Sequence, residues 1–392
     1  MGKDICSAVH HGLCITAYGA VNPCCATTQD FSNLENTSNL VDYFYNDVEL
    51  EKARKIEIET EEWLEACKGC EIKSKSGLVS RKDKFSNWYR FVNPKWTAEN
   101  KHEILHMDIS FGNSCNQKCI MCNSNFSSQW LDDDLEMKET APYIRNWNGL
   151  KLKNWSLTYE YLDQIALLVT DKTQKIEIKG GEPLYDKRFE YFVLKVLEVN
   201  ENVMFNVNTN GTHFSMKNIE MLNKIKNINI DISFDGINKI YEWIRGTEWK
   251  KSEENFQTYL QHCKHSCNLN YTTSMYNIDH FEIFYNWAAD LSEKYKKAVP
   301  CLFTQVVMTP SFQQIMYADK RRIYQGLEQI ERIKYDPRGT QSSTNLFRPR
   351  LEIIQKYLEN QLSKTADISI FEKAHNHFVK IRGWDIRDYV NL

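Results

Sequence analysis

The stretch ILHMDISFGNSCNQKCIMCN, residues 104–123, joins an apolar, β-branched run to three closely spaced cysteines. Three residues separate Cys115 from Cys119, and two residues separate Cys119 from Cys122. Three thiolates can hold three irons of a cubane cluster, whereas four thiolates are needed to close it. One iron then stays open to a further ligand, as one position of a catalytic zinc does. The alternatives are a zinc site with a fourth ligand from elsewhere, or ordinary buried cysteines.

Short apolar runs alternate with helical patterns over residues 101–310. The expected strands are 104–112, 175–181, 203–210, 228–236, 269–277 and 302–310. Helical patterns lie between them, as at 189–200 and 280–295. Such alternation predicts right-handed crossovers and a parallel sheet. We therefore expect an α/β fold with an open, partial (β/α)6 barrel, an N-terminal cysteine-rich module over 1–100 and a helical C-terminal cap over 311–392. In the N-terminal module we expect one helix, near 49–66.

Polar and glycine-rich residues gather where these strands end, which is where ligands bind in parallel α/β sheets. The second strand ends in KGGEP (179–183), whose two glycines allow a ligand close to the backbone and whose Glu182 can pair with an ammonium group. Polar side chains ending the third and fourth strands are Asn208, Asn210, Ser233 and Asp235. GGEP taken alone is also compatible with a plain strand-to-helix turn. Asn208 and Asn210 are also compatible with an Asx turn before Gly211.

The CxxxCxxC spacing, with the large apolar Met121 before its last cysteine, resembles the signature of the radical S-adenosylmethionine (radical SAM) superfamily. The resemblance covers the whole middle region. It implies a [4Fe–4S] cluster on Cys115, Cys119 and Cys122 whose open iron binds SAM. An electron from the reduced cluster would break a C–S bond of SAM, and the 5′-deoxyadenosyl radical would abstract hydrogen from a substrate. The cofactor supplies this chemistry, and the protein supplies position and exclusion of water.

The same resemblance implies which side chains contact SAM. The GGE motif would meet its methionine amino group, and the end of the fourth strand would meet its ribose hydroxyls. Arg245, in YEWIRGT, resembles an arginine that meets the SAM carboxylate, a task that suits a guanidinium fork, with a surface arginine as the alternative. The residues implied in this way are Gly180, Gly181, Glu182, Asn208, Asn210, Ser233, Asp235 and Arg245.

A second set of cysteines lies in GAVNPCC (19–25) and CKGCEIKSKSGLVSR (67–81). The order of cysteine, glycine and cysteine resembles the SPASM/twitch auxiliary-cluster module, in the group that carries it before the barrel. The family glutamate is missing, since Lys73 or Ser74 stands at its position. The resemblance implies an auxiliary [4Fe–4S] cluster on Cys6, Cys24, Cys67 and Cys70.

Several points about this second set stay open. Cys25 is the nearest substitute for Cys24, and Cys14 lacks a matching role. The gap between the cysteine pairs is too long for a zinc ribbon, whereas a zinc knuckle remains an alternative. Four thiolates complete a cluster, which favours electron transfer or structural support, although a free or substrate-supplied ligand remains an alternative.

Composition limits the classes of function. The 392 residues, 42% of them hydrophobic, suffice for one large core plus a smaller module. A net charge of −3 excludes a global basic field for nucleic acid. No apolar run approaches the roughly 20 residues of a membrane span, and MGKDICSAVHHG lacks a signal-peptide core. We expect a soluble, cytoplasmic protein, and in a reducing cytosol a set of twelve cysteines indicates metal ligands rather than disulfides.

Three further features carry less weight. HCKHSC places Cys263 and Cys267 four residues apart, on what we expect to be one helix end. Cys301 begins the sixth strand and is expected to be a small buried hydrophobe. The tail AHNHFVKIRGWDIRDY predicts an amphipathic helix followed by a turn at Gly383.

Three hypotheses follow. The first is a radical SAM oxidoreductase or mutase that carries out a redox-coupled modification of a peptide or small metabolite, with flavodoxin or ferredoxin as electron donor and no membrane partner. The second keeps this chemistry but acts on a nucleotide or nucleic-acid base. The third is a non-catalytic iron–sulfur or zinc-binding relative, which the intact cysteine triplet and GGEP oppose.

Overall fold

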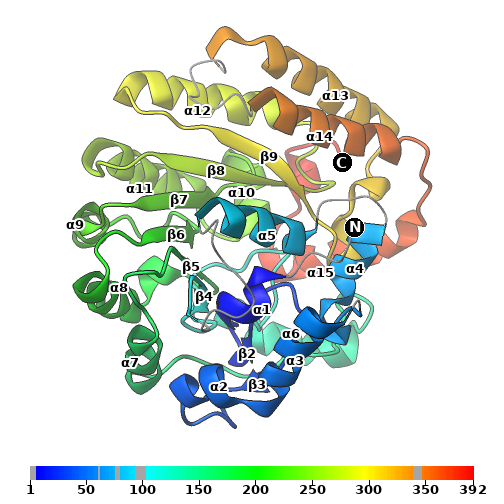
Figure 1. Cartoon of the computed structure of the whole chain (residues 1–392). Helices are drawn as coiled ribbons and strands as arrows, with labels where there is room; N and C mark the ends of the chain where they lie inside the picture. Colours follow the sequence, from blue (N-terminus) through cyan, green and yellow to red (C-terminus); the bar gives the residue numbers. More distant parts are fainter. Residues whose placement is uncertain (1–5, 61, 76–79, 93–102, 339–346) are drawn as a thin grey trace. The chain divides into compact units, whose positions relative to one another are not determined.

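The computed structural model describes residues 6–60, 62–75, 80–92, 103–338 and 347–392 (Figure 1). The chain divides into two compact units. The first unit contains residues 1–114, 154–207 and 225–228, and the second contains residues 115–153, 208–224 and 229–392. Among the described helices, none combines the length and apolar character that crossing a membrane requires.

The first unit is built on a sheet with strand order β3-β2-β1-β4-β5-β6. Its strands are β1 (Gly12–Ile15), β2 (Ala20–Asn22), β3 (Ser32–Asn33), β4 (His106–Ser110), β5 (Lys175–Lys179) and β6 (Met204–Thr209), of which β6 enters the second unit at Asn208. β1, β4, β5 and β6 run parallel. β2 turns back antiparallel to β1, and β3 pairs antiparallel with β2.

Helices precede and follow these strands along the chain, and polar side chains cap several of the helices. They are α1 (Ser7–His11), α2 (Leu40–Asn46), α3 (Val48–Glu59), α4 (Lys68–Lys75), α5 (Arg81–Val92), α7 (Tyr159–Leu167) and α8 (Arg188–Val199). Asn39, Asp47 and Thr158 each accept a hydrogen bond from a backbone N–H in the first turn of α2, α3 and α7. These caps satisfy donors that a helix start leaves free, and so fix where each helix begins.

The parallel strands of the first unit carry different side chains on their two faces. Apolar residues of one face are fully buried, and they include Leu13, Met107, Ile109, Ile176, Ile178, Phe205 and Val207. On the other face, Cys14, Asp108, Glu177 and Asn206 form one row across four strands. Parallel strands usually read as apolar on both faces. This face of the sheet therefore departs from the usual apolar pattern of parallel strands.

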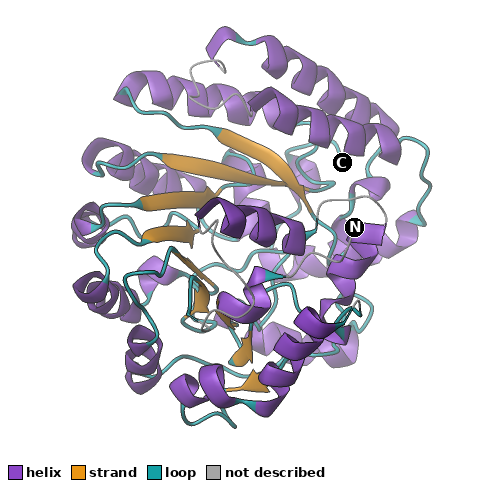
Figure 2. Cartoon of the chain, in the orientation of Figure 1, coloured by secondary structure: helices purple, strands orange, loops and turns teal. Residues whose placement is uncertain are grey.

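The second unit has three parallel strands in the order β7-β8-β9. They are β7 (Ile228–Ser233), which begins in the first unit, β8 (Cys267–Thr273) and β9 (Cys301–Val306). Its helices are α6 (Leu131–Thr140), α9 (Met216–Lys224), α10 (Asn238–Arg245), α11 (Trp249–His262), α12 (Phe281–Tyr295), α13 (Lys320–Tyr335), α14 (Phe347–Gln361) and α15 (Ile368–Arg382). Helices separate these strands along the chain. Figure 2 distinguishes the helices, in purple, from the strands, in orange.

An aromatic cluster holds the helices of the second unit against its strands. The Phe234 ring, just after β7, contacts Tyr241, Trp249, Phe256 and Trp287 at centroid distances of 5.4–5.9 Å. Most of these pairs meet edge to face, the arrangement that aromatic quadrupoles favour. Phe234 is fully buried, so this cluster fixes the end of β7, where polar residues follow.

The expected α/β class with parallel strands is confirmed. All six strands predicted for the middle region form, as β4 to β9, and the helices expected at 189–200 and 280–295 form as α8 and α12. The turn at Gly383 also forms, with φ of 74° after α15. The helix expected near 49–66 is shorter, since α3 ends at Glu59. The division at residues 100 and 310 stays a prediction.

Two expectations about local structure are wrong or incomplete. Cys263 and Cys267 do not share a helix, because α11 ends at His262 and Cys267 begins β8. The N-terminal region was expected to hold one helix, yet its described residues form α1 to α5 and contribute β1, β2 and β3 to the sheet of the first unit. These strands have four, three and two residues, too few for a period to be visible in sequence.

Candidate functional site

The cysteine loop of the second unit is organised around one buried glutamine. Gln117 receives a weak contact from the Cys119 thiol, with Sγ 3.5 Å from Oε1. The backbone N–H of Gln117 donates to Cys115 Sγ at 3.5 Å. Its Nε2 donates to Tyr241 and Thr247 hydroxyls, each at 2.9 Å. The loop is thereby tied to α10 and to the turn after it.

Further hydrogen bonds shape the turns that present the cysteines. The Ser127 hydroxyl donates to the Gln117 carbonyl at 2.6 Å, and the indole N–H of Trp130 donates to the Cys119 carbonyl at 2.9 Å. Cys122 N–H donates to that same Cys119 carbonyl at 2.9 Å, closing a turn between the two cysteines. Backbone groups of a buried loop must find partners, and these bonds provide them.

Burial sets the protonation of the loop thiols. Burial raises the pKa of Cys119, and it raises the pKa of Cys122 to about 12. A bound metal would supply the positive charge that these thiols need to become thiolates. Within the described ranges, no three His, Cys, Asp or Glu side chains are grouped to hold one metal ion. In a cubane, different cysteines bind different irons, so this donor set fits a cluster better than a mononuclear site.

Arg245, at the end of α10, forms a buried ion pair beside the loop. Its Nη2 lies 2.6 Å from Asp235 Oδ2, and its Nη1 lies 3.7 Å from Cys119 Sγ. Although burial lowers it, the neighbouring carboxylate of Asp235 raises the pKa of Arg245. The Nε of Arg245 has no hydrogen-bond partner among the described residues. A buried guanidinium with a free N–H fits a carboxylate ligand such as that of SAM.

The other predicted residues of the second unit lie at strand ends. Asn210 donates to Asn116 Oδ1 at 2.9 Å and approaches Cys115 Sγ at 3.9 Å. Asn208 and Ser233 are half-buried near the ends of β6 and β7. The structure thus brings Asn210, Asp235 and Arg245 to the cysteine loop.

The GGE motif belongs to the first unit. Gly180 and Gly181 adopt positive φ values of 80° and 57°. A side chain at Gly181 would overlap the Ser114 carbonyl oxygen. The N–H of Glu182 donates to this carbonyl at 2.8 Å, and its Oε1 accepts from Leu184 N–H at 3.1 Å. These glycines therefore let the backbone turn directly against the residue that precedes Cys115.

The four cysteines predicted to bind an auxiliary cluster line one cavity of the first unit. The cavity has an empty volume of about 430 Å³, which includes space open to solvent. Cys6 caps α1, Cys24 follows β2, and Cys67 and Cys70 lie on adjoining turns at the start of α4. Cys14 and Cys25 are not among the cavity's lining residues. The structure brings together the four residues that the sequence resemblance selected.

Electrostatics at this cavity resemble those of the cysteine loop. Burial raises the pKa of Cys6 to about 11 and that of Cys67 to about 12. Glu57 accepts from Cys6 N–H at 3.0 Å and from Lys82 Nζ at 2.8 Å. Lys82, itself buried, supplies a positive charge beside the cavity, which favours bound thiolates.

Sequence reasoning missed several functional candidates. Asp134 and Arg145 form a buried pair behind the cysteine loop, with Arg145 Nε 2.8 Å from Asp134 Oδ1. In the first unit, Lys179 Nζ donates to Asp108 Oδ2 at 2.5 Å. Burial raises the pKa of Asp108 to about 7. The sequence did contain a sign of this pair. Charged residues alternate with apolar ones in strands expected to be parallel, where both faces are usually apolar.

No curated protein sequence matches the chain. A solved structure of native anSMEcpe with bound AdoMet and Kp18Cys peptide is similar over 59% of this chain and 61% of that chain, at 15% identity and a TM-score of 0.42. Streptococcus suis SuiB bound to S-adenosylmethionine is similar over 68% and 58% of the two chains, at 13% identity and a TM-score of 0.36. The chain thus spans less than two thirds of the length of either relative.

A family model is more specific than these structural likenesses. Residues 109–288 match the model of the radical SAM superfamily. The matched segment begins inside β4 and ends inside α12, so it contains the cysteine loop, GGEP, Asp235 and Arg245. The chain therefore carries a radical SAM domain over residues 109–288.

Proposed function

We propose that this protein is a radical SAM oxidoreductase or mutase. Cys115, Cys119 and Cys122 hold a [4Fe–4S] cluster with one open iron, and SAM binds beside it. When bound, these groups supply reductive cleavage of SAM and hydrogen abstraction from a substrate. The observation that carries the proposal is the cysteine loop inside the matched domain, packed against a buried Arg245 whose Nε is free among the described residues.

The chain's own residues bind and orient these groups. Arg245 offers its free N–H to the SAM carboxylate, while Asp235 fixes the direction of the guanidinium. Gly180 and Gly181 provide a backbone turn without side chains, and Glu182 is a partner for the methionine ammonium group. Asn208, Asn210 and Ser233 complete the polar strand ends.

A second [4Fe–4S] cluster belongs in the cavity of the first unit. Cys6, Cys24, Cys67 and Cys70 supply four thiolates, which complete a cubane. A cluster with four protein ligands suits electron transfer better than binding of SAM. Its presence favours a redox-coupled reaction, with flavodoxin or ferredoxin as the external electron donor.

The substrate is a peptide or small metabolite with polar groups. The polar row of the first unit supports this choice, because Asp108 Oδ1 has no hydrogen-bond partner among the described residues. Arg81 Nε, which also lacks one there, offers a donor in the same unit. A buried acceptor and a buried donor suit a substrate with its own hydrogen-bonding groups.

Iron content and SAM cleavage test the proposal. The reconstituted protein should form 5′-deoxyadenosine when incubated anaerobically with dithionite and SAM. Replacing Cys115, Cys119 and Cys122 with Ala should abolish this product and remove about four irons per chain. A zinc-loaded protein without iron, or a triple variant that keeps iron and activity, would overturn the proposal.

Cys301→Ala is the matched control for these substitutions. Cys301 is a buried cysteine in β9 and is not a proposed ligand. Its loss should leave iron content and 5′-deoxyadenosine formation unchanged. An equal loss of iron in this variant would show that the triple variant suffers from unfolding rather than from missing ligands.

A further inference from the structure

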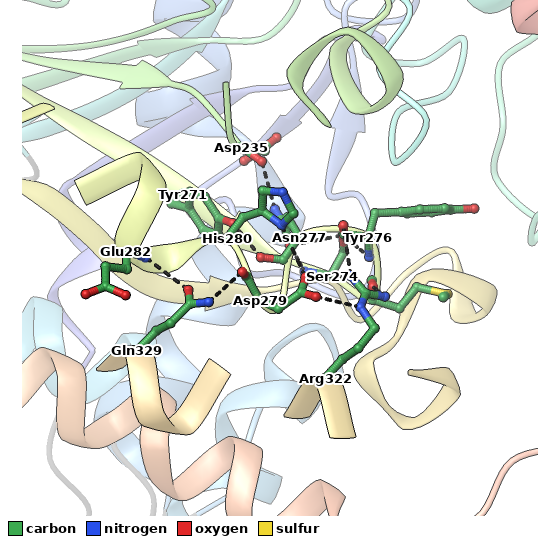
Figure 3. A network of polar contacts seen from close by, with 11 residues as sticks. Asp235, Tyr271, Ser274, Tyr276, Asn277, Asp279, His280, Glu282, Arg322 and Gln329 are labelled. Carbon is green, nitrogen blue, oxygen red and sulfur yellow. Dashed lines mark hydrogen bonds and ion pairs between the residues drawn. The ribbon is translucent and has the colours of Figure 1, made fainter. Parts of the chain in front are cut away.

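Arg322 of α13 clamps the loop 274–280 between β8 and α12 (Figure 3). Its Nε and Nη2 donate to the two carboxylate oxygens of Asp279 at 2.9 and 2.7 Å. Its Nη1 donates to the Met275 carbonyl at 2.7 Å, and Nη2 donates to the Tyr276 carbonyl at 3.3 Å. Arg322 is only 1% exposed, so its guanidinium donates its hydrogen bonds to groups inside the protein.

A second side chain of α13 holds the same loop. Gln329 donates from Nε2 to the Asp279 carbonyl at 2.7 Å, and its Oε1 accepts from Glu282 N–H at 3.1 Å. Seven residues separate Gln329 from Arg322, which places them two turns apart on one face of the helix. The loop is therefore fixed at two points along α13.

One chain of contacts runs from this loop to the cysteines through Asn277. The Asn277 side chain donates to the Asp235 carbonyl at 2.9 Å and to the Thr272 carbonyl at 3.0 Å. The Asp235 carboxylate accepts from Thr272 N–H at 2.8 Å and pairs with Arg245 at 2.6 Å. Arg245 in turn lies beside Cys119. Figure 3 shows Asn277, a residue of the clamped loop, next to Asp235.

A separate chain of contacts starts from Met275 and reaches the same place. Met275 N–H donates to the Gln313 carbonyl at 3.0 Å, and Gln313 Nε2 donates to the Ile120 carbonyl at 2.8 Å. Ile120 N–H donates to the Ile244 carbonyl at 2.9 Å. Ile120 follows Cys119, and Ile244 precedes Arg245. The two chains thus converge on the arginine and the cysteine that lie side by side.

Such a buried polar network costs desolvation, and an apolar contact would stabilise the fold as well. What it adds is a fixed geometry, because each bond has a defined direction and length. We infer that Arg322 is a positioning residue for the SAM site. Through the loop 274–280, Arg322 fixes the positions of Arg245 and the cysteine loop relative to each other. The inference rests on the proposed function, in which Arg245 meets SAM.

Arg322→Lys tests the inference in the reconstituted full chain. The lysine keeps the positive charge but replaces the rigid fork with a single ammonium, which cannot serve Asp279 and two carbonyls together. We expect the SAM concentration for half-maximal cleavage to rise about tenfold or more, since small misplacements near a reaction centre cost up to about 100-fold. The change that SAM causes in the EPR spectrum of the reduced cluster should weaken in parallel.

Arg332→Gln is the matched control. Arg332 lies on the same helix and pairs with Glu282 of α12, with Nη2 2.9 Å from Oε2, but this pair is largely exposed. It should leave SAM cleavage and the EPR response unchanged. If Arg322→Lys does not fold, Gln329→Ala takes its place, because it removes only the contacts of Gln329 with Asp279 and Glu282. This variant should also raise the SAM concentration for half-maximal cleavage.

The outcomes separate the inference from the function on which it rests. A wild-type protein without a SAM-dependent EPR change would refute the proposed function and the inference together. A wild-type response that survives in a folded Arg322→Lys or Gln329→Ala variant refutes the inference alone. A lowered unfolding midpoint with normal SAM dependence would also refute it, since Arg322 would then act on stability only.

Discussion

Removing the Asp134 carboxylate should destabilise the folded chain by about 3–5 kcal/mol, the usual cost of leaving one member of a buried ion pair alone. Asp134 is 0% exposed and accepts from Ser124 N–H at 2.7 Å. Its partner Arg145 donates to the Cys122 carbonyl and lies over the Trp130 ring, 4.6 Å from its centroid. In Asp134→Leu, the guanidinium would stay buried without a counter-charge, and the Ser124 N–H would lose its acceptor.

A double-mutant cycle in urea measures this pair. Asp134→Leu and Arg145→Met should each lower the free energy of unfolding of the iron-free chain by about 3–5 kcal/mol. The double variant should lose less than the sum, because neither charge is then left alone, with an interaction energy of about 0.5–3 kcal/mol. Circular dichroism and tryptophan fluorescence follow the transition.

The exposed pair of Arg332 and Glu282 provides the scale for comparison. Its side chains are 54% and 33% exposed, so Arg332→Gln should cost at most about 1 kcal/mol. If Asp134→Leu costs no more than Arg332→Gln, the pair does not stabilise the cysteine loop. Additive single-variant losses would show that Asp134 and Arg145 act independently, which contradicts the contact between them.

Three further predictions concern the backbone, pH and iron. Gly181→Ala should destabilise the chain by more than Gly149→Ala in urea unfolding, because both have positive φ but only Gly181 would overlap a backbone carbonyl. Burial raises the pKa of Asp108 to about 7, so the folded chain binds this proton more tightly than the unfolded chain. The free energy of unfolding should therefore fall as pH rises from about 4 towards neutrality, and Asp108→Asn should reduce that slope. Replacing Cys67 and Cys70 with Ser should remove about four irons but spare part of the SAM cleavage, as measured by iron analysis and 5′-deoxyadenosine formation.

The sequence predicts the parallel strands and the cysteine loop because each leaves a local pattern. β4 to β9 combine apolar runs with polar residues at their ends, and the cysteine spacing is contained within eight residues, 115–122. The four cavity cysteines were selected through a family motif rather than through spacing. What the motif could not supply is the cavity itself, which forms because η1 (Glu65–Cys67) and α4 lie against α1 and the turn after β2.

The residues that sequence missed are charged side chains whose burial leaves no local mark. Asp134 lies in LDDDLEMKET and Arg322 lies in DKRRIYQ. Both charged patterns indicate a solvent-exposed helix face. In each case, one charge of several similar neighbours is buried by contacts with residues outside its own helix. Periodicity identifies the face of a helix, but it cannot identify the distant carboxylate that a guanidinium meets.

The polar groups on one face of the first unit's sheet either stabilise the fold or serve a ligand. The pair of Asp108 and Lys179 can distinguish these two roles. Lys179 of β5 donates to the carboxylate of Asp108 on the neighbouring parallel strand β4, and Asp108 is only 1% exposed. Replacing a buried ion pair with apolar residues of similar volume is often neutral or stabilising, by about 1–4 kcal/mol. Asp108→Leu together with Lys179→Met should therefore keep or raise the free energy of unfolding in urea.

The same double variant should keep SAM cleavage in the absence of substrate, because neither residue is proposed to hold the cluster or to contact SAM. It should lose the stimulation of 5′-deoxyadenosine formation by substrate. Groups that cost stability persist in a sheet face when a ligand needs their charge or protons. A double variant that unfolds more easily than the wild type by over about 1 kcal/mol would instead make the pair a structural contact, since the apolar replacement then fails to compensate.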